Sequence, residues 1–395
     1  MYKFKYLLSV VIPTKDRYEY LKECVSTILD INSDKIEVVV QDNTKENKEI
    51  VDFFKKVNNK NLKYFHSSLA LSQTENSEKA IENSSGEYIC FIGDDDSVAE
   101  IIVSLTEIMK ENKIDSCNVN MSGYYWPDVV FKYSSKYSLS FDLRKAKVER
   151  INTKKILKNY LKSGMQEITL LPRLYHGILS RRALDKIKTL SGSYFPGPSP
   201  DMANATVAAL VLNKHFFVKV PVVVSGTSFN SAAGKGLRGE HKGKLSSVSQ
   251  LPKDIEKTWN KRIPKLWLGN TIWPETSIKS LENSKAYEFI EIFNFYSMYA
   301  RIWLKHKEYR VVLKEYILSP KDYLLTTFAA SKEITKWLFK RFSIKMRKFL
   351  GLEYIYMNDM SLTEACKITN NHNEKRNNIK IIKRELERLN KKENM

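Results

Sequence analysis

The sequence predicts an α/β fold with a mostly parallel sheet, followed by a mainly helical C-terminal region. In the first 100 residues, short apolar runs alternate with helical patterns, which is typical of parallel strands joined by crossover helices. The apolar runs are continuous, as in strands that are covered on both faces. After residue 250 the pattern is largely helical. We therefore divide the 395 residues into a domain at 1–250 and a separate region at 251–395.

The first 100 residues contain the clearest strand signals. Strands are predicted at Leu8–Ile12, Ile36–Val40, Leu62–Phe65 and Tyr88–Ile92. Between the first two strands, apolar residues recur at three- and four-residue spacing from Leu21 to Leu29, as on one face of a helix. A second helix is predicted from Ser72 to Ile81. This alternation brings the carboxyl ends of the strands to one edge of the sheet.

The pattern is less regular from residue 101 to residue 250. It predicts a helix at Ile101–Lys110, a strand at about Ser116–Met121, a helix at Ala203–Asn213 that Asp201 opens as N-cap, and a strand at Phe216–Val224. Residues 122–170 are rich in Tyr and Lys and show no clear pattern. The segment 225–244 is rich in Gly, Ser and Lys and is predicted to be a mobile loop.

Charge is distributed unevenly along the chain. The formal net charge is +20, of which residues 1–100 carry −5 and the remainder +25. Such a basic remainder fits an anionic partner, or lysines that are simply spread over solvated surfaces.

Cysteine usage and hydropathy indicate the compartment. The four cysteines are scattered without metal-ligand spacing, which fits a reducing environment. The apolar run after Lys3 and Lys5 stops at Pro13 without a signal-peptide cleavage site. The sequence has no run of about 18 apolar residues that could span a membrane. We therefore expect a cytoplasmic protein.

Three polar segments follow predicted strands, namely Pro13–Arg17, Gln41–Asn43 and Gly93–Asp96. Ligands of parallel sheets bind at this edge. Adjacent carboxylates raise one another's pKa unless a cation neutralises them. Oxygen ligands of this kind suit Mg²⁺ or Mn²⁺, which substrate phosphates then complete. The alternative is that Asp94–Asp96 form only a solvated acidic turn or a helix cap.

The sequences VVIPTKDR at 10–17, VVQDN at 39–43 and GEYICFIGDDD at 86–96 together resemble family 2 glycosyltransferases of GT-A fold. They occur in the family's order and approximate spacing, and the likeness runs from about Leu8 to about Gly226. One position departs from the family's Asp-x-Asp-Asp pattern, because Gly93 stands where its first Asp would be.

The resemblance implies roles for individual residues. Residues 1–100 would form the nucleotide-sugar half and residues 101–250 the acceptor half. Asp42 would hydrogen-bond the base, and Asp94 would lie at the ribose. Asp95 would bind the divalent metal, with Asp96 as the alternative ligand. The other residues expected beside the donor nucleotide are Pro13, Thr14, Arg17 and Asn76.

Asp201 is the predicted catalytic base. It follows a Pro/Gly-rich turn and precedes a helix, where the family places its catalytic carboxylate, and the segment His176–Leu184 also resembles the family. Pro200 replaces the Glu of the family's usual Glu-Asp pair, and Asp201 could instead only cap its helix. Further along, Lys235, Arg238 and His241 could close over a diphosphate or belong to a solvated loop.

The resemblance implies an inverting transfer from a nucleotide diphosphate sugar, with UDP as the expected nucleotide, to a glycan hydroxyl. The expected acceptor is a lipid-linked oligosaccharide or a surface polysaccharide. One alternative is a nucleic-acid-binding protein, although the cations do not follow a nucleic-acid-binding motif, so we expect no nucleic-acid partner. The other is a metal-dependent nucleotidyltransferase, although the chain lacks a Gly-rich, Lys-containing N-terminal loop for a triphosphate.

Residues 251–395 carry a net charge of +12. From Ile334 onward, aromatic and aliphatic residues alternate with lysines and arginines, which fits either a helix on the anionic inner face of the cell membrane or one packed on its own domain. Near the C-terminus, Ile379, Ile382, Leu386 and Leu389 have heptad spacing. This seam predicts weak homo-oligomerisation through a short coiled coil.

Overall fold

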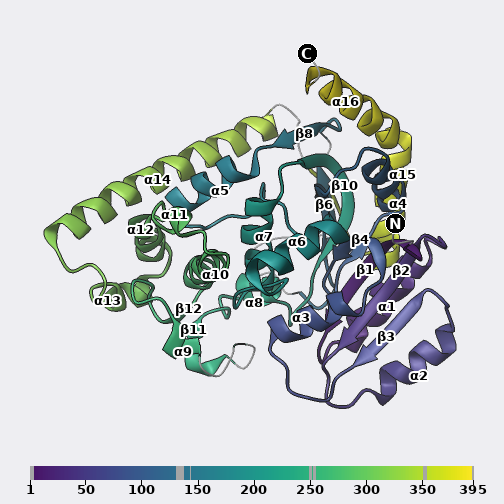
Figure 1. The fold of residues 1–395 in the computed structure, drawn as a ribbon, viewed down its shortest axis with the longest axis horizontal. Helices are drawn as coiled ribbons and strands as arrows, with labels where there is room; N and C mark the ends of the chain where they lie inside the picture. The colour runs from purple at the N-terminus through teal and green to yellow at the C-terminus, as the bar shows by residue number, and fades with distance from the viewer. Residues whose placement is uncertain are drawn as a thin grey trace.

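A computed structural model describes residues 4–129, 138–142, 144–248, 251, 255–349 and 354–393 (Figure 1). The strands are β1 (Tyr6–Thr14), β2 (Ile36–Asp42), β3 (Leu62–His66), β4 (Gly86–Phe91), β5 (Ser97–Val98), β6 (Ser116–Tyr125), β7 (Leu139–Asp142), β8 (Val148–Ile151), β9 (Gly177–Ser180), β10 (His215–Thr227), β11 (Gly243–Lys244), β12 (Leu266–Trp267) and β13 (Tyr354–Met357). The α-helices are α1 (Tyr18–Leu29), α2 (Lys48–Val57), α3 (Gln73–Glu82), α4 (Ile101–Glu111), α5 (Thr153–Lys162), α6 (Arg181–Ser191), α7 (Pro200–Val211), α8 (Ala232–Leu237), α9 (Ile255–Thr258), α10 (Gly269–Asn283), α11 (Tyr287–Ile290), α12 (Phe295–Lys305), α13 (Arg310–Leu313), α14 (Pro320–Phe349), α15 (Leu362–Lys375) and α16 (Asn378–Glu393).

The central sheet confirms the predicted α/β fold. In the described ranges, eleven strands form one sheet, whose main path is β13-β7-β6-β9-β4-β1-β2-β3. Strands β3, β2, β1 and β4 are parallel, and β9 lies antiparallel between β4 and β6. Thr14 is level with Asp42, and Asp42 with His66, so the polar segments after β1 and β2 meet at one edge.

The parallel strands are covered on both faces, which explains their continuous apolar runs. In β1, Val10 belongs to one core cluster together with Leu21 of α1. The next residue, Val11, belongs to a second cluster together with Ile81 of α3 and Ala203 of α7. All five side chains are fully buried. The sheet therefore buries alternate side chains in two separate cores.

Three segments differ from their predicted structure. Residues 122–170 contain the end of β6, then β7, β8 and α5 in the described part, and polar residues in these short elements obscured their pattern. Segment 225–244 is not simply a loop, because β10 extends to Thr227 and α8 follows. Helix α7 begins at Pro200 with Ser199 at its N-cap, so Asp201 lies within the first turn instead of capping it.

Residues 255–349 form a largely helical part with its own apolar core. Helices α10 and α12 pack there together with α5 and α7 of the preceding domain. Helix α14 runs as a single long helix along one side of the molecule (Figure 1). Within the described ranges, no helix combines the length and apolar content needed to cross a bilayer.

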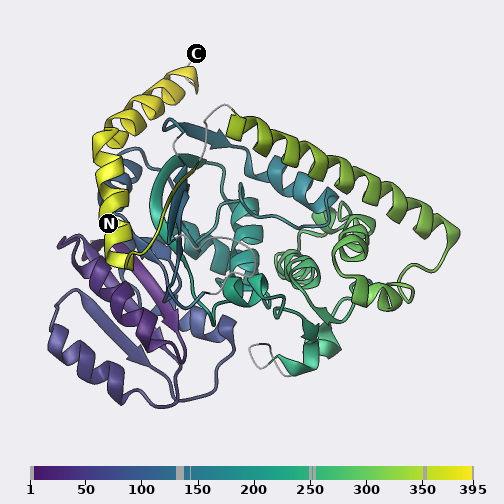
Figure 2. The same cartoon turned by 180° about the vertical axis from the view of Figure 1, so that it is seen from behind.

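The last two helices return to the first core. Figures 1 and 2 both draw α15 and α16 on the side of the molecule away from α10 and α12, where α15 contacts α1 and β10 and α16 contacts α4 and β8. Leu362 and Cys366 of α15, and Ile382 and Leu386 of α16, belong to the same cluster as β1 and α1. The division at residue 250 stays a prediction, and α15 and α16 pack on the first core rather than on that of residues 255–349.

The predicted oligomerisation seam is therefore used within the chain. Ile382 is 0 % and Leu386 3 % exposed, and α16 packs against α4 and β8. Ile379 and Leu389 pack against the same cluster. A side chain buried in its own fold is not available to a partner helix, so the structure does not support self-association through these heptads.

Candidate active site

The acidic turn Asp94–Asp96 follows β4 and faces the end of β1. All three carboxylates are buried, with 3 %, 4 % and 1 % exposure. Such burial of adjacent like charges requires specific partners, since unpaired carboxylates in an apolar interior are strongly destabilising. The structure therefore rejects a solvated acidic turn.

Arg17 is the cation that neutralises the first two carboxylates. Its terminal nitrogen lies 3.1 Å from Asp94 Oδ1 and 2.8 Å from Asp95 Oδ2. Thr14 donates a 2.7 Å hydrogen bond to Asp94, and Ser228 donates one of 2.7 Å to Asp95. Arg17 also donates to Ser228, so the ends of β1 and β10 close around the pair.

Asp96 is directed into the protein. It accepts hydrogen bonds from the backbone N–H groups of Gly93 and Gly226, each at 2.7 Å. It also accepts from the Tyr175 hydroxyl at 3.1 Å and contacts His176 Nε2 at 2.7 Å. Four protein partners thus fix Asp96, whereas Asp94 and Asp95 face Arg17.

The pKa values reflect the same arrangement. Burial raises the pKa of Asp94 to about 7, although the charge of Arg17 opposes the shift. Burial and the neighbouring Asp96 raise the pKa of Asp95. Burial alone would lower the pKa of Arg17, but the charges of the acidic turn raise it overall. The three carboxylates carry more negative charge than the single guanidinium of Arg17 neutralises, so a further cation would stabilise the turn.

Asp94 and Asp95 provide an incomplete set of ligands for a divalent metal. No group of three or more His, Cys, Asp or Glu side chains in the described chain is arranged to hold an ion. Mg²⁺ and Mn²⁺ need no such cage, because one or two carboxylates and substrate phosphates are enough. The pair Asp94 and Asp95 fits that arrangement and does not fit a metal held by protein alone.

Two glycines permit the close packing of the turn. A Cβ atom on Gly226 would lie 1.7 Å from the Asp95 carbonyl oxygen, which also accepts a 2.9 Å bond from Trp126 Nε1. A Cβ atom on Gly93 would lie 3.0 Å from oxygens of both Asp95 and Asp96. A side chain at position 93 would therefore crowd the carboxylates of Asp95 and Asp96 in this turn.

The other residues predicted at the nucleotide also lie at this edge. Asp42 is fully buried and accepts from the Tyr18 hydroxyl at 2.7 Å, the Tyr64 hydroxyl at 2.8 Å and the Thr44 N–H at 2.8 Å. Pro13 lies opposite Gln41 in the sheet. Asp42 is thus occupied by protein partners, and its contact with a base stays a prediction.

Asn76 on α3 reaches the same edge from the face of the sheet that α3 covers. Its Nδ2 donates to the carbonyls of Thr14 and Gln41 at 3.5 and 3.4 Å. Its buried Oδ1 atom has no partner in the structure. An unsatisfied buried acceptor at the edge where the nucleotide is expected remains consistent with the predicted role.

Asp201 lies in the first turn of α7 and is only partly buried. Its Oδ1 accepts from the Ser199 hydroxyl at 2.5 Å and from the Met202 N–H at 2.8 Å. The preceding turn is held by α10, since Thr276 accepts from the Ser199 N–H at 3.2 Å. Tyr175 donates a hydrogen bond to Asp96 of the acidic turn. Burial and the charges of Asp96, Asp95 and Asp201 raise the pKa of Tyr175.

Two of the three cations predicted to close over a diphosphate, Arg238 and His241, have other partners in the structure. Arg238 pairs with Glu240 at 2.6 Å and lies over the ring of Phe229. His241 packs against Trp267. Lys235 lies in α8. The segment instead contributes Ser228, which the sequence did not indicate and which only the approach of β10 to the acidic turn reveals.

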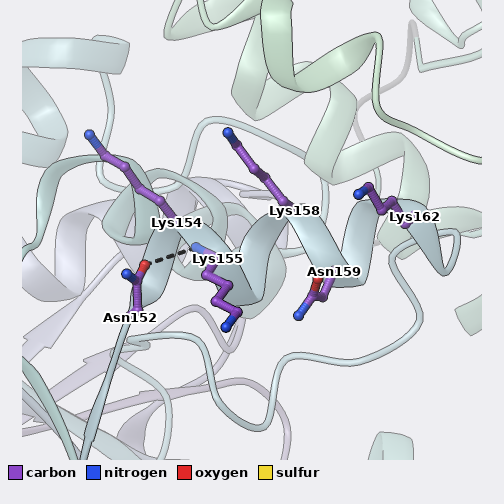
Figure 3. A pocket seen from close by; sticks show the side chains of 6 residues that line it. All are labelled: Asn152, Lys154, Lys155, Lys158, Asn159 and Lys162. Atoms are coloured by element: carbon purple, nitrogen blue, oxygen red, sulfur yellow. Dashed lines mark hydrogen bonds between the residues drawn. The ribbon is translucent and has the colours of Figure 1, made fainter.

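Tyr175 and His176 were also missed as site residues. His176 has no ligand-spaced partner in the sequence, and its contact with Asp96 spans 80 positions. Two hollows of the described surface are not lined by the acidic turn. One, of about 420 Å³, follows α5 between Lys154, Lys155, Lys158, Lys162, Asn152 and Asn159 (Figure 3). The other, of about 320 Å³, lies beside Gln41 and His66.

The family model described as "Glycosyl transferase family 2" matches residues 9–185. Residues 9–185 therefore belong to this family of glycosyltransferases, as their motifs predicted, and this match favours glycosyl transfer over nucleic-acid binding or nucleotidyl transfer. No curated protein matches the chain significantly.

Solved structures with a similar course of the chain are distant in sequence. S. aureus TarS is 15% identical and has a TM-score of 0.41, over 83% of this chain and 53% of TarS. Its fragment 1–349 in complex with UDP-GlcNAc is 17% identical with a TM-score of 0.45, over 83% and 88% of the two chains. The mannosyltransferase PcManGT from Pyrobaculum calidifontis, solved with GDP-Man and Mn²⁺, is 14% identical with a TM-score of 0.40, over 83% and 85%. This chain thus spans about half the length of full-length TarS.

Proposed function

We propose that the protein transfers a sugar from a UDP-sugar to a hydroxyl group of a glycan acceptor, with inversion at the anomeric carbon. The observation that carries this proposal is the buried pair Asp94 and Asp95, which Arg17 neutralises only in part at the carboxyl ends of β1 and β4. This edge is where α/β sheets bind nucleotides. The family membership of residues 9–185 supplies the reaction class.

We assign the metal to Asp95 rather than to Asp96. Asp96 already has four protein partners, whereas Asp95 lies at the Arg17 side of the turn. A bound Mn²⁺ or Mg²⁺ would stabilise the negative charge of the departing diphosphate. Asp94 and Thr14 would hold the ribose side of the donor, and Arg17 would be free to contact phosphate once a metal neutralises the pair.

Asp201 acts as the base in this proposal. It takes the proton of the acceptor hydroxyl while the oxygen attacks the anomeric carbon. The new carbon–oxygen bond forms as the bond to the diphosphate breaks, so the proton ends on Asp201 and the electron pair on the nucleoside diphosphate. A single displacement of this kind inverts the configuration. The bonds from Ser199 and Met202 keep one carboxylate oxygen fixed, and the other has no partner within the described structure.

The donor assignment is tested with calorimetry and with release of nucleoside diphosphate from a panel of nucleotide sugars. Wild type should bind UDP more tightly with Mn²⁺ than without it, and should not respond to DNA. Asp95→Ala should lose about 100-fold in metal-dependent UDP affinity. Asp201→Asn should bind UDP like wild type and lose roughly 10²- to 10⁴-fold in turnover.

Matched substitutions at Asp185, an exposed residue of α6, serve as controls. Asp185→Ala and Asp185→Asn should behave like wild type. Unchanged UDP binding in Asp95→Ala would show that the metal lies elsewhere, and near-normal turnover in Asp201→Asn would remove it as the base.

We further propose that the enzyme works on a lipid-linked glycan at an anionic membrane surface, which α14 contacts. Every residue from Ile334 to Met346 is exposed, including Trp337, Phe339 and Phe342. The same stretch contains four Lys or Arg residues and no Asp or Glu. A helix that is exposed on all sides is marginal by itself, whereas aromatic and basic residues together stabilise a helix at an anionic interface.

Sedimentation with vesicles tests this contact. The protein should co-sediment with vesicles of phosphatidylglycerol and phosphatidylcholine and not with phosphatidylcholine alone. Charge reversal at Lys336, Lys340 and Arg341 should lower the partition by about 100-fold. Reversal at Lys55 and Lys56 of α2, which are also exposed, is the control. Equal binding of both variants, or no binding by wild type, would contradict the proposal.

A further inference from the structure

Arg173 is a buried cation without a partner. It precedes β9 in the segment that connects α5 to that strand, and only 8 % of the residue is exposed. Its Nε atom is buried without any hydrogen-bond partner. Throughout the described ranges, its guanidinium forms no ion pair and no hydrogen bond with the rest of the chain. Arginine stays protonated in proteins, so this side chain carries a full positive charge.

The backbone around Arg173 connects the two parts of the active site. The Leu174 N–H donates a 3.0 Å bond to Asn204, which lies one helical turn after Asp201 on α7. The Tyr175 hydroxyl and His176 both contact Asp96 of the acidic turn. Arg173 therefore begins a short bridge that runs from the helix of the proposed base to the donor side of the site.

The charge of Asp201 acts on the Arg173 guanidinium. Burial lowers the pKa of Arg173, and the charge of Asp201 is the largest influence that opposes this shift. Asp94 and Asp95, in contrast, are paired with Arg17. Arg17 thus serves the acidic turn, whereas no carboxylate of the described residues lies within ion-pair distance of Arg173.

A purely structural role does not explain this arrangement. A buried guanidinium that stabilises a fold does so through hydrogen bonds to carbonyls or carboxylates, as Arg181 does with the carbonyls of Ile81, Ser84 and Gly86. Arg173 has no such bonds, and a charge removed from water without a partner is costly. An anionic group of a ligand would supply the missing partner.

We propose that Arg173 forms an oxyanion subsite beside Asp201, which takes a carboxylate or phosphate carried by a substrate. The planar guanidinium binds either group in a bidentate manner. The anion could belong to the acceptor or to a sugar acid on the donor, since both meet next to the base. This inference rests on the proposed function, in which Asp201 faces the reacting hydroxyl.

The experiment compares wild type, Arg173→Met, Arg173→Lys and Arg182→Met by calorimetry. Met replaces the aliphatic part of the side chain and removes the charge, and Arg182 is an exposed arginine on α6. For the donor source, UDP-glucuronate is compared with UDP-glucose. For the acceptor source, UDP-saturated protein is titrated with glycerol phosphate against glycerol, and with oligogalacturonate against maltooligosaccharide.

Wild type should prefer the anionic member of at least one pair by about 10- to 100-fold. Arg173→Met should abolish that preference, Arg173→Lys should retain part of it, and Arg182→Met should keep all of it. UDP affinity should be the same in all four proteins, and Arg173→Met should unfold at the same temperature as wild type or a higher one.

The inference is overturned if wild type shows no preference above about threefold in any pair, or if Arg173→Met retains the preference. A lower unfolding temperature of Arg173→Met with unchanged ligand selectivity would likewise assign Arg173 a structural role. Failure of wild type to bind UDP is a separate result, which counts against the proposed function.

Discussion

Gly226 holds the donor side of the site in place because it has no side chain. The carbonyl of Asp95 occupies the position that a Cβ atom would take, and the Gly226 N–H binds Asp96. The sequence shows only a glycine after a strand, which could equally end β10 in a turn. Its contact with Asp95 lies 131 positions away along the chain, so no local pattern could reveal it.

Gly226→Ala should therefore displace the acidic turn. We expect a loss of about 1–3 kcal/mol in the free energy of unfolding, as for other overpacked sites, and at least roughly tenfold weaker metal-dependent UDP binding. Urea unfolding and calorimetry measure the two effects. Gly236→Ala in α8 is the control, because nothing lies within 4 Å of its added Cβ atom. A Gly226→Ala protein with normal UDP affinity would show that the turn tolerates the shift.

Helix α16 shows how one sequence pattern serves two different packings. Heptad spacing describes which residues share a face of the helix, and this was correct for Ile382 and Leu386. It does not say whether that face meets another chain or the same one. Here Ser361 caps α15 and the preceding strand β13 pairs with β7, so α15 packs against α1 and β10, and α16 then packs against α4.

Ile382→Asp should destabilise the protein by about 3 kcal/mol or more, because it places an unpaired charge in the first core. Thermal unfolding measures this loss, and analytical ultracentrifugation should show the same oligomeric state as wild type. Lys383→Asp, at an exposed neighbour, should change neither property. If Ile382→Asp instead dissociated a wild-type oligomer without a lower unfolding temperature, the seam would be an interface between chains.

At the scale of the whole molecule, the helical part supports the catalytic part through α10. This helix packs along α7, and its Ser280 donates to the carbonyl of Pro196 in the turn before Asp201. It also buries Glu275, whose carboxylate accepts from the Asn260 N–H. Burial raises the pKa of Glu275 from 4.5 to about 7, although that bond opposes the shift.

Glu275 should make stability depend on pH. Its folded pKa lies above the unfolded value, so the folded protein binds this proton more tightly. The resulting stabilisation is fully present below pH 4.5 and is lost as the pH rises through about 7. A shift of this size corresponds to about 3 kcal/mol.

Urea unfolding at pH 5 and pH 8 measures this dependence. In Glu275→Gln, the difference in the free energy of unfolding between pH 5 and pH 8 should be smaller than in wild type by roughly 3 kcal/mol. The same substitution at Glu288, an exposed residue of α11, should leave the difference unchanged. Equal pH dependence in Glu275→Gln and wild type would mean that this carboxylate titrates normally.

The sequence by itself determined the parallel core and the chemistry of its edge. Continuous apolar runs such as Leu8–Ile12 form strands wherever both faces are covered, and three adjacent carboxylates at a strand end require a cation. These are consequences of local composition and order. They sufficed to predict β1 to β4 and the acidic turn, whereas the family was predicted from the resemblance of the motifs at 10–17, 39–43 and 86–96.

Only the tertiary structure decided which side chains meet. It directed Asp96 to His176 and left Asp95 at Arg17, brought Ser228 and Gly226 to the turn, and left Arg173 unpaired beside the Asp201 helix. Each of these contacts joins residues far apart in the chain. Their formation depends on how α7 joins a core of the sheet to the core of the helical part, which local periodicity does not describe.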